Sequence, residues 1–261
     1  MTQPSSVDLV YKLDHSVEVE PSPRWVRVQF GGQYVADSKR VLLIRSASKL
    51  PEYAFHPDDV RLELLGPAGE PTDDPRNGPT TYYNVKVNGA VAEHAAWTFD
   101  DPPPERAVLK GHVGFKWNKM DHWYEEEEEV FVHPRDPYKR VDTMPSSRHV
   151  RVVVDGVTVA ETNRPTLLFE TGLPVRYYLP PEDVRMKHLE PTSAYTRCPY
   201  KGLASYWSVR VGDEEYRNLV WGYPDPIPEC PKIKGLLCFY NEKVDLYVDG
   251  EMQARPQSPW S

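Results

Sequence analysis

The sequence repeats itself at a constant spacing, and this repetition limits the possible folds more than any other feature. Ala160 follows Ala36 by 124 positions (160 − 36), and many other identical residues are related by the same step. The further pairs include Arg40 and Arg164, Asp59 and Asp183, Val60 and Val184, Pro67 and Pro191, Pro75 and Pro199, Gly78 and Gly202, Tyr82 and Tyr206, Trp97 and Trp221, and Gly111 and Gly235. One spacing kept over so many matches predicts two tandem copies of one fold, and not a solenoid of short units.

Placing the two copies on the chain divides it into five parts. These are an N-terminal arm (1–23), a first repeat domain (24–133), a linker (134–147), a second repeat domain (148–250) and a tail (251–261). The length of 261 residues suits one large domain or two of ordinary size. We expect Val17 and Val19 to add an edge strand and residues 254–261 to be disordered or loosely docked. The linker is expected to act as a structural staple or as part of a site.

Local patterns within each copy are typical of β-structure. Alternating apolar residues lead into Gly31-Gly32 and into Asp155-Gly156, which is the signature of a hairpin with a two-residue turn. The 27 prolines argue against long helices, and segments 57–60 and 181–184 are each expected to form one short helix that begins at a proline. The expected fold class is mainly β, with two tandem copies of an antiparallel β-sandwich or open barrel, each with one short helix.

Composition argues against several classes of partner and location. A net charge of −8 leaves no basic stripe for a nucleic-acid backbone, and no run approaches the roughly 18 apolar residues that a membrane helix needs. Because the three cysteines are too few for a disulfide framework and no secretory leader is recognised, we expect a cytoplasmic protein. The acidic run 125–129 is expected to be a solvated strand edge.

Motifs for metals and cofactors are not found in the sequence. There is no Cys-x-x-Cys pair, no phosphate-binding glycine loop and no Gly-x-Ser-x-Gly nucleophile motif. His112, Asp121 and His122 lie near one expected hairpin, but histidines spaced so far apart are a weak metal signal. We therefore expect no metal site, and no particular cofactor is indicated.

One loop of the second copy is the best candidate for chemistry. Segment 196–202 has the sequence Thr-Arg-Cys-Pro-Tyr-Lys-Gly, so a thiol and an amine lie close together on a loop bounded by proline and glycine. The first copy keeps that proline and glycine, but Asp74 stands where the second copy has Cys198. Asn77 likewise stands where the second copy has Lys201. Groups found in only one copy are not needed by the shared fold, and they are therefore candidates for function.

The same comparison of the two copies identifies a second segment, 169–178. The candidate catalytic residues are Cys198, Lys201 and Glu170, and the candidate substrate-binding residues are Arg176, Tyr178, Tyr200 and Thr196. A cysteine near cations is typical of reactive thiols, and a lysine beside a glycine can bind an anion as a point charge. Structural alternatives stay open, namely an ion pair between Glu170 and Arg176, a core role for Tyr178, and an inert buried Cys198.

Several stretches of the second copy are shared with a known family. Segments 168–174 (Leu-Phe-Glu-Thr-Gly-Leu-Pro), 177–184 (Tyr-Tyr-Leu-Pro-Pro-Glu-Asp-Val) and 196–202 resemble the domain-of-unknown-function 427 family. Segments 221–223 and 233–235 fit its later portion, and the linker from 133 to 138 is similar to that of its two-copy members. The resemblance therefore covers nearly the whole chain, although the first copy departs from it at the positions of the thiol and the amine.

The resemblance implies a compact, mostly β domain of a bacterial or fungal type. The family is sometimes labelled nucleotidyltransferase-like, which would imply a two-metal site for phosphoryl transfer. The chain has no paired aspartates after a Gly-Ser that would support such a site.

Two classes of function fit the candidate residues. In the first, the protein is an enzyme acting on a small polar or anionic metabolite, with Cys198 as nucleophile or polar contact. Lys201 and Arg176 then anchor an anion, and Glu170 accepts a proton. In the second, the same residues form a non-catalytic module that binds a small ligand. A structural or interaction role for the sheet faces and the nucleotidyltransferase-like activity are further alternatives.

Overall fold

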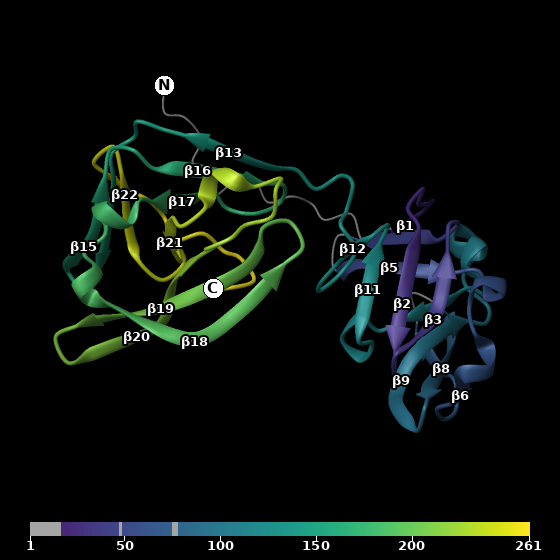
Figure 1. The fold of residues 1–261 in the computed structure, drawn as a ribbon. Coiled ribbons are helices and arrows are strands. Elements are labelled where there is room, and N and C mark those ends of the chain that lie inside the picture. The colour runs from purple at the N-terminus through teal and green to yellow at the C-terminus, as the bar shows by residue number, and fades with distance from the viewer. Residues whose placement is uncertain (1–16, 47–48, 75–77) are drawn as a thin grey trace. The chain divides into compact units, whose positions relative to one another are not determined.

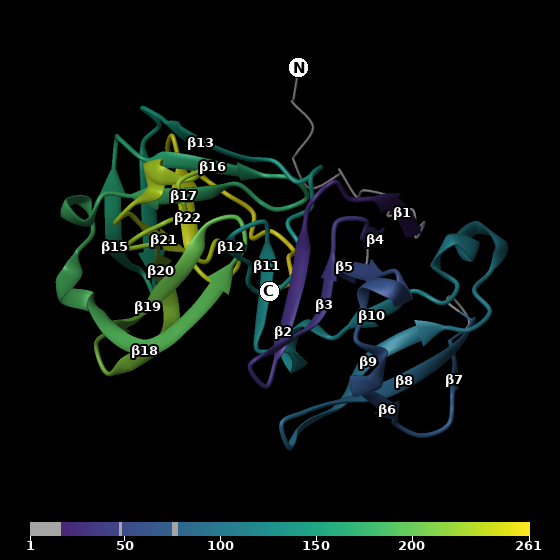
Figure 2. The same ribbon diagram turned by 45° about the vertical axis from the view of Figure 1, so that its right-hand side comes forward.

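The computed structural model describes residues 17–46, 49–74 and 78–261, and the chain divides into two compact units (Figure 1, Figure 2). One unit ends at Asp136 and the other begins at Pro137. Both consist mainly of antiparallel strands, and the longest helical segment among the described residues is a 3₁₀-helix of six residues. Within the same ranges, no helix is long and apolar enough to cross a membrane.

The first unit is built from two antiparallel sheets. Its strands are β1 (Val17–Pro21), β2 (Val26–Phe30), β3 (Gln33–Ser38), β4 (Leu42–Ser46), β5 (Lys49–Phe55), β6 (Leu65–Pro67), β7 (Thr72–Asp74), β8 (Gly78–Val87), β9 (Ala90–Phe99), β10 (Val113–Phe115), β11 (His122–Glu125) and β12 (Glu128–Glu129). The large sheet has the order β1-β4-β5-β10-β9-β8-β6, with β7 beside β8, and the small sheet has the order β12-β11-β2-β3. The arm therefore supplies an edge strand, β1, as expected.

The second unit has the same topology as the first. Its strands are β13 (Val141–Pro145), β14 (Val150–Val154), β15 (Val157–Thr162), β16 (Thr166–Glu170), β17 (Arg176–Leu179), β18 (Leu189–Cys198), β19 (Gly202–Val211), β20 (Glu214–Gly222), β21 (Leu237–Phe239), β22 (Asp245–Val248) and β23 (Glu251–Met252). The large sheet has the order β13-β16-β17-β21-β20-β19-β18, and the small sheet has the order β15-β14-β22-β23. Figure 1 shows β18, β19 and β20 running side by side as a curved ribbon.

Short 3₁₀-helices connect the strands. They are η1 (Pro57–Asp59), η2 (Leu62–Leu64), η3 (Pro104–Leu109), η4 (Trp117–Lys119), η5 (Pro181–Asp183), η6 (Met186–His188) and η7 (Pro231–Ile233). The two short helices expected from the sequence are η1 and η5, and each begins at a proline, which suits the first helical position because proline has no amide hydrogen to donate. The other 3₁₀ turns were not expected.

Contacts repeat at the spacing seen in the sequence. Isolated β-bridges join Ala36 to Val60 and Ala160 to Val184, and ion pairs join Arg40 to Asp59 at 2.9 Å and Arg164 to Asp183 at 3.0 Å. Equivalent residues thus make equivalent contacts, which confirms that the two repeats share one fold.

The two predicted hairpin turns are present. Gly31 and Gly32 have φ values of 57° and 76°, and Asp155 and Gly156 have values of 47° and 72°. Two successive residues with positive φ are typical of the type I′ turn, whose twist matches that of the paired strands. At Gly31 a side chain would also meet Val87 at 2.9 Å, so this position requires glycine for space as well as for conformation.

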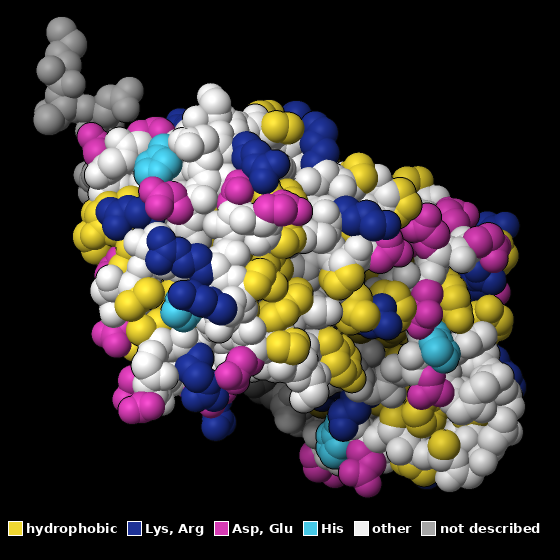
Figure 3. All heavy atoms as spheres, turned by 60° about the vertical axis from the view of Figure 1, so that its left-hand side comes forward, with side chains coloured by type: hydrophobic (Ala, Val, Ile, Leu, Met, Phe, Trp, Pro, Cys, Tyr) yellow, Lys and Arg dark blue, Asp and Glu magenta, His cyan; other side chains and the backbone are white. Residues whose placement is uncertain are grey.

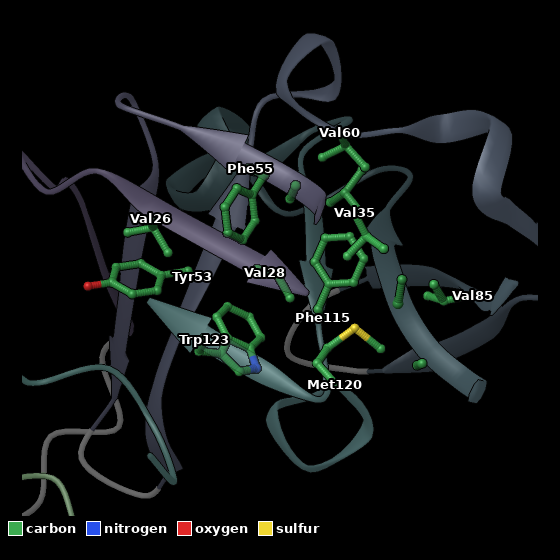
Figure 4. Close-up of a cluster of buried hydrophobic side chains, with 14 of the residues drawn as sticks. Val26, Val28, Val35, Tyr53, Phe55, Val60, Val85, Phe115, Met120 and Trp123 are labelled. Atoms are coloured by element: carbon green, nitrogen blue, oxygen red, sulfur yellow. The ribbon is translucent and has the colours of Figure 1, made fainter. Parts of the chain in front are cut away.

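The main core of each unit lies between its two sheets. In the first unit the ring of Phe55 packs 5.8 Å from Phe115 and 6.2 Å from Trp123, measured between ring centroids (Figure 4). Tyr53 belongs to the same cluster, and its hydroxyl points out of it in Figure 4. The hydroxyl donates to the buried carboxylate of Glu125 at 2.9 Å.

The prediction that segment 125–129 is a solvated strand edge is therefore wrong for its first residue. Besides Tyr53, the Glu125 carboxylate binds Arg24 at 2.8 Å and accepts a hydrogen bond from the amide of Arg135 at 3.3 Å. A carboxylate can be buried when its oxygens are paired in this way.

Each large sheet also carries apolar residues on the face turned away from the small sheet. Successive residues of a strand point to opposite faces, so Leu179 lies in the core between the sheets while Tyr178 lies on the other side. We call these the inner and outer faces of the large sheet. The outer cluster of the first unit contains Leu42, Ile44, Ala54, Trp97, Phe99 and Leu109. That of the second unit contains Leu168, Tyr178, Ala204, Tyr206, Trp221, Tyr223, Cys230, Ile233 and Cys238.

Candidate functional site

A tight hairpin loop positions the candidate thiol and amine. Cys198 ends β18 and pairs with Gly202 at the start of β19, so three residues form the loop between them. The amide of Lys201 donates to the carbonyl of Cys198 at 3.3 Å, and the carbonyl of Lys201 accepts from the amide of Ile227 at 3.1 Å. Gly202 has a φ of 106°, which side chains rarely adopt, so the glycine is needed to close this loop.

Lys201 and Glu170 form a buried ion pair on the outer face. Their charged atoms lie 2.5 Å apart, and their side chains are only 10% and 6% exposed. The ammonium of Lys139, from the predicted linker, lies 3.2 Å from the other oxygen of Glu170. Two ammonium groups therefore share one carboxylate, and the trio has a formal charge of +1.

The thiol of Cys198 belongs to the same group of residues. Burial by itself would lower the pKa of Lys201, but the interactions with Cys198 and Glu170 outweigh it and raise that pKa above its ordinary value. Lys201 therefore stays an ammonium group beside the sulfur. Cys198 is only partly buried, in contrast to the lysine and the glutamate.

Two further ionisable groups surround this trio. Tyr223 and Cys230 are 5% and 2% exposed. Burial, together with the charges of Cys198 and Glu170, raises the pKa of Tyr223. Burial also raises the pKa of the Cys230 thiol to about 11, although nearby Lys201 opposes the shift. Both groups are therefore neutral near pH 7.

Arg176 forms a second buried ion pair on the same face. Its guanidinium donates two hydrogen bonds to the carboxylate of Glu242, each of 2.7 Å, and the two side chains are 7% and 0% exposed. The hydroxyl of Ser258 donates to the same carboxylate. Burial would raise the pKa of Glu242, but these hydrogen bonds lower it below its ordinary value.

Tyr178 is a core residue as well as a neighbour of Arg176. It is 1% exposed, and its hydroxyl accepts a hydrogen bond from the indole of Trp221 at 3.2 Å. Cys238 lies beside it, fully buried, and burial raises the pKa of that thiol to about 12. Cys238 is therefore a packed, neutral side chain.

The remaining candidates lie at the hairpin. The hydroxyl of Thr196 is 2.7 Å from that of Tyr206, and the ring of Tyr200 lies 5.6 Å from the ammonium of Lys139. The structure thus brings the three candidate catalytic residues together. Arg176 and Glu170 have different partners rather than each other. Tyr178 lies in the same outer cluster as Tyr223 and Cys230.

Several residues of this region were missed in the sequence, although the comparison of the two copies could have found them. Glu242 stands opposite Asn118, so a carboxylate replaces an amide, and Tyr223 stands opposite Phe99, so a hydroxyl is added. Lys139 was not singled out because the linker has no clear counterpart in the other copy.

The tryptophans that the two repeats share are packed differently. At Gly114 of the first unit, an added Cβ would lie 2.0 Å from the ring of Trp97, so the indole lies directly against the strand. The second unit has Cys238 at the equivalent position, and Trp221 instead packs against Tyr240 with ring centroids 4.5 Å apart. The two shared indoles therefore have different neighbours in the two units.

Metal ligands do not gather around these side chains. Across the described ranges, no group of three or more His, Cys, Asp or Glu residues is placed to hold a metal ion. His112 packs against His56, whereas His122 binds Glu129 at 2.7 Å.

Comparison with models of protein families identifies the repeated domain. The family described as a domain of unknown function (DUF427) matches residues 18–126 and again residues 142–250. The search of curated proteins found no match.

Proposed function

Because the chain belongs to the DUF427 family and contains its domain twice, we propose that the second repeat carries a site for a small polar or anionic molecule. Cys198 is the reactive group or polar contact of this site, and Lys201 and Glu170 set its charge. The observation that carries the proposal is the buried pair of Lys201 and Glu170, formed beside the thiol of Cys198. The first repeat acts as a scaffold without these groups.

Differences in exposure support different roles for the three residues. Lys201 and Glu170 are almost fully buried, whereas Cys198 is partly exposed. Breaking a buried pair is costly because it leaves a charge out of water without a partner. Lys201 therefore keeps its ammonium group in a fixed place beside Cys198, a residue that is only partly buried. Such an arrangement suits the stabilisation of negative charge on sulfur or on a bound ligand.

Charge also favours an anionic ligand. Lys139 and Lys201 both face Glu170, so one positive charge of the trio is not balanced within it. Thr196 and Tyr200 border the same hairpin and supply ligand contacts in this proposal. Arg176 and Tyr178 have partners of their own, so they act by shaping the neighbouring part of the outer face.

An enzymatic form of the site uses the thiol as a nucleophile. The sulfur of Cys198 forms a bond to an electrophilic carbon of the substrate, and its proton passes to Glu170. The bond to the leaving group breaks, and the electron pair leaves with that group. In the alternative form the same residues hold the ligand and no bond is made.

Alkylation of the native full chain with iodoacetamide, followed by mass spectrometry, tests the role of the lysine. We expect Cys198 to be the residue modified, because Cys230 and Cys238 are 2% and 0% exposed. Lys201→Met should slow the reaction at pH 7 at least tenfold, and Lys201→Arg should largely preserve it. The matched control is Lys234→Met, since Lys234 pairs with Asp225 at 3.0 Å but is 65% exposed.

Equal rates in the Lys201→Met and Lys234→Met variants would overturn the reactive role. A thermal-shift screen of small carboxylates and phosphates then tests binding. A true ligand should raise the melting temperature of the natural chain but not that of Lys201→Met, and its consumption would identify an enzyme. If no compound distinguishes the two chains, the proposed site is wrong.

A further inference from the structure

The last residues of the sequence cover Arg176, and their contacts resemble those of a bound ligand. We propose that segment 256–261 occupies a second binding site, formed by Arg176, Glu242 and Trp221, for a planar aromatic group that carries a hydrogen-bond donor. We call this the Arg176 site. It requires no reaction and does not depend on Cys198.

The first element of recognition is a cation–π contact between the guanidinium and aromatic rings. The Cζ atom of Arg176 lies 5.4 Å from the ring centroid of Trp221 and 5.2 Å from that of Trp260. Glu242 occupies the edge of the guanidinium through two hydrogen bonds of 2.7 Å, so the faces of the group are left for aromatic rings. Arginine commonly binds rings in this way, and a charge removed from water strengthens the contact. Trp221 belongs to the sheet, whereas Trp260 is supplied by the tail.

The second element is a hydrogen bond to a buried carboxylate. The side chain of Glu242 is 0% exposed, and it accepts from the hydroxyl of Ser258 as well as from Arg176. A ligand with an aromatic ring and a hydrogen-bond donor can therefore contact the guanidinium of Arg176 and the carboxylate of Glu242 at the same time.

The tail presents these two groups as a small preformed turn. The amide of Ser258 donates to the hydroxyl of Ser261 at 2.8 Å, and that hydroxyl donates to the carbonyl of Pro256 at 3.2 Å. Trp260 remains 40% exposed, and no residue from 251 to 261 is buried. The segment can therefore leave the sheet without opening the core of the unit. The prediction of a loosely docked tail agrees with this exposure, but it gave no hint of what the tail binds.

The shared fold does not require the Arg176 site. At the equivalent positions the first repeat has Glu52 and Asn118, and it forms the same sheet. A buried ion pair is costly to keep when apolar residues could replace it. Its presence in one repeat, covered by a removable ring and donor, is best explained by recognition.

Calorimetric titration with the synthetic peptide of residues 256–261 tests the inference. The receptor is the full chain with Ser258→Ala and Trp260→Ala, which opens the site, and the control receptor is Gln257→Ala, an exposed neighbour in the same turn. We expect saturable binding to the opened chain and at least tenfold weaker binding to the natural chain and to the control. A peptide with alanine in place of its tryptophan should not bind.

A second arm separates a free aromatic molecule from a peptide as the natural occupant. Displacement of the peptide by N-acetyltryptophanamide would show that a small ring with an N–H donor suffices, whereas no displacement would assign the site to a peptide segment. Adding Cys198→Ser to the opened chain should leave the affinity unchanged, so the result is independent of the thiol proposal. No saturable binding up to millimolar peptide, or equal binding to the opened and natural chains, would overturn the inference.

Discussion

Replacing Glu242 with glutamine tests how strongly charge holds the buried pair with Arg176. The substitution keeps the shape of the side chain but leaves a guanidinium that is 7% exposed without its anion. Removing one partner of a buried pair costs about 3–5 kcal/mol. In a unit of this size, 1 kcal/mol corresponds to about 3–6 °C of melting temperature. The expected fall is therefore roughly 9–30 °C.

Differential scanning calorimetry of the full chain is the suitable assay, because two units can melt in separate transitions. Only the transition of the second unit should move. Glu190→Gln is a matched control, since Glu190 binds Arg210 with similar hydrogen bonds of 2.8 and 3.1 Å but both side chains are about half exposed. Water solvates the exposed partner after this change, so the control should melt close to the natural chain.

A double variant, Arg176→Met with Glu242→Leu, completes the test. Apolar residues of similar size often replace a buried ion pair with no loss of stability, so this chain should melt within about 5 °C of the natural one. The reasoning is refuted if Glu242→Gln melts like Glu190→Gln. It is also refuted if the double variant is as unstable as the single one, because the pair would then be needed for packing rather than held by charge.

Three further outcomes are expected in the same assay. First, the pKa of Glu242 is lowered in the folded protein, so the carboxylate contributes its full stabilisation above the ordinary value of 4.5. This stabilisation is lost as the pH falls through the lower folded value. The melting temperature of the second unit should therefore drop on acidification below about pH 4.5, and it should drop less in Glu242→Gln. Tyr223→Phe should melt within about 5 °C of the natural chain, because the substitution removes only one hydroxyl and the first repeat has Phe99 at the equivalent position. Gly202→Ala should cost about 1–3 kcal/mol, because an added Cβ would need a φ of 106° and would lie 3.3 Å from the amide nitrogen of Ile227.

Each of these outcomes has a clear contradiction. An identical acid profile in the natural chain and in Glu242→Gln would show that another group governs the acid transition. A fall above 10 °C in Tyr223→Phe would make that hydroxyl part of the fold. Unchanged melting of Gly202→Ala would mean that the hairpin tolerates a side chain and does not fix the loop by its glycine.

The fold could be predicted to a large extent because its strongest signals are local. The type I′ turns at Gly31-Gly32 and at Asp155-Gly156 need residues that accept positive φ, and such residues are visible in the sequence. Pairs at one spacing then fixed the number of copies. The acidic run was misjudged at Glu125 because composition describes a whole run, whereas alternation along the strand sends its first side chain inward.

The candidate site could be predicted only in part, for a physical reason. Comparison of the copies identified Cys198, Lys201 and Glu170, since each differs in chemistry from its counterpart in the first copy. The partner of Arg176 lies 66 residues away, and the two meet because β17 pairs with β21. Such a contact depends on the order of strands in the sheet, which the spacing of motifs along the chain does not predict.

Coverage of each large sheet on both sides has a consequence for the design of new variants. The sandwich interior is apolar in both repeats. The outer layer consists of aliphatic residues, a tryptophan and a phenylalanine in the first repeat, but it is rich in tyrosine and cysteine in the second. The two repeats thus show that one fold accepts two different sets of side chains on the outer face of its large sheet. The outer-face residues of the second repeat can therefore be introduced one by one at the equivalent positions of the first repeat.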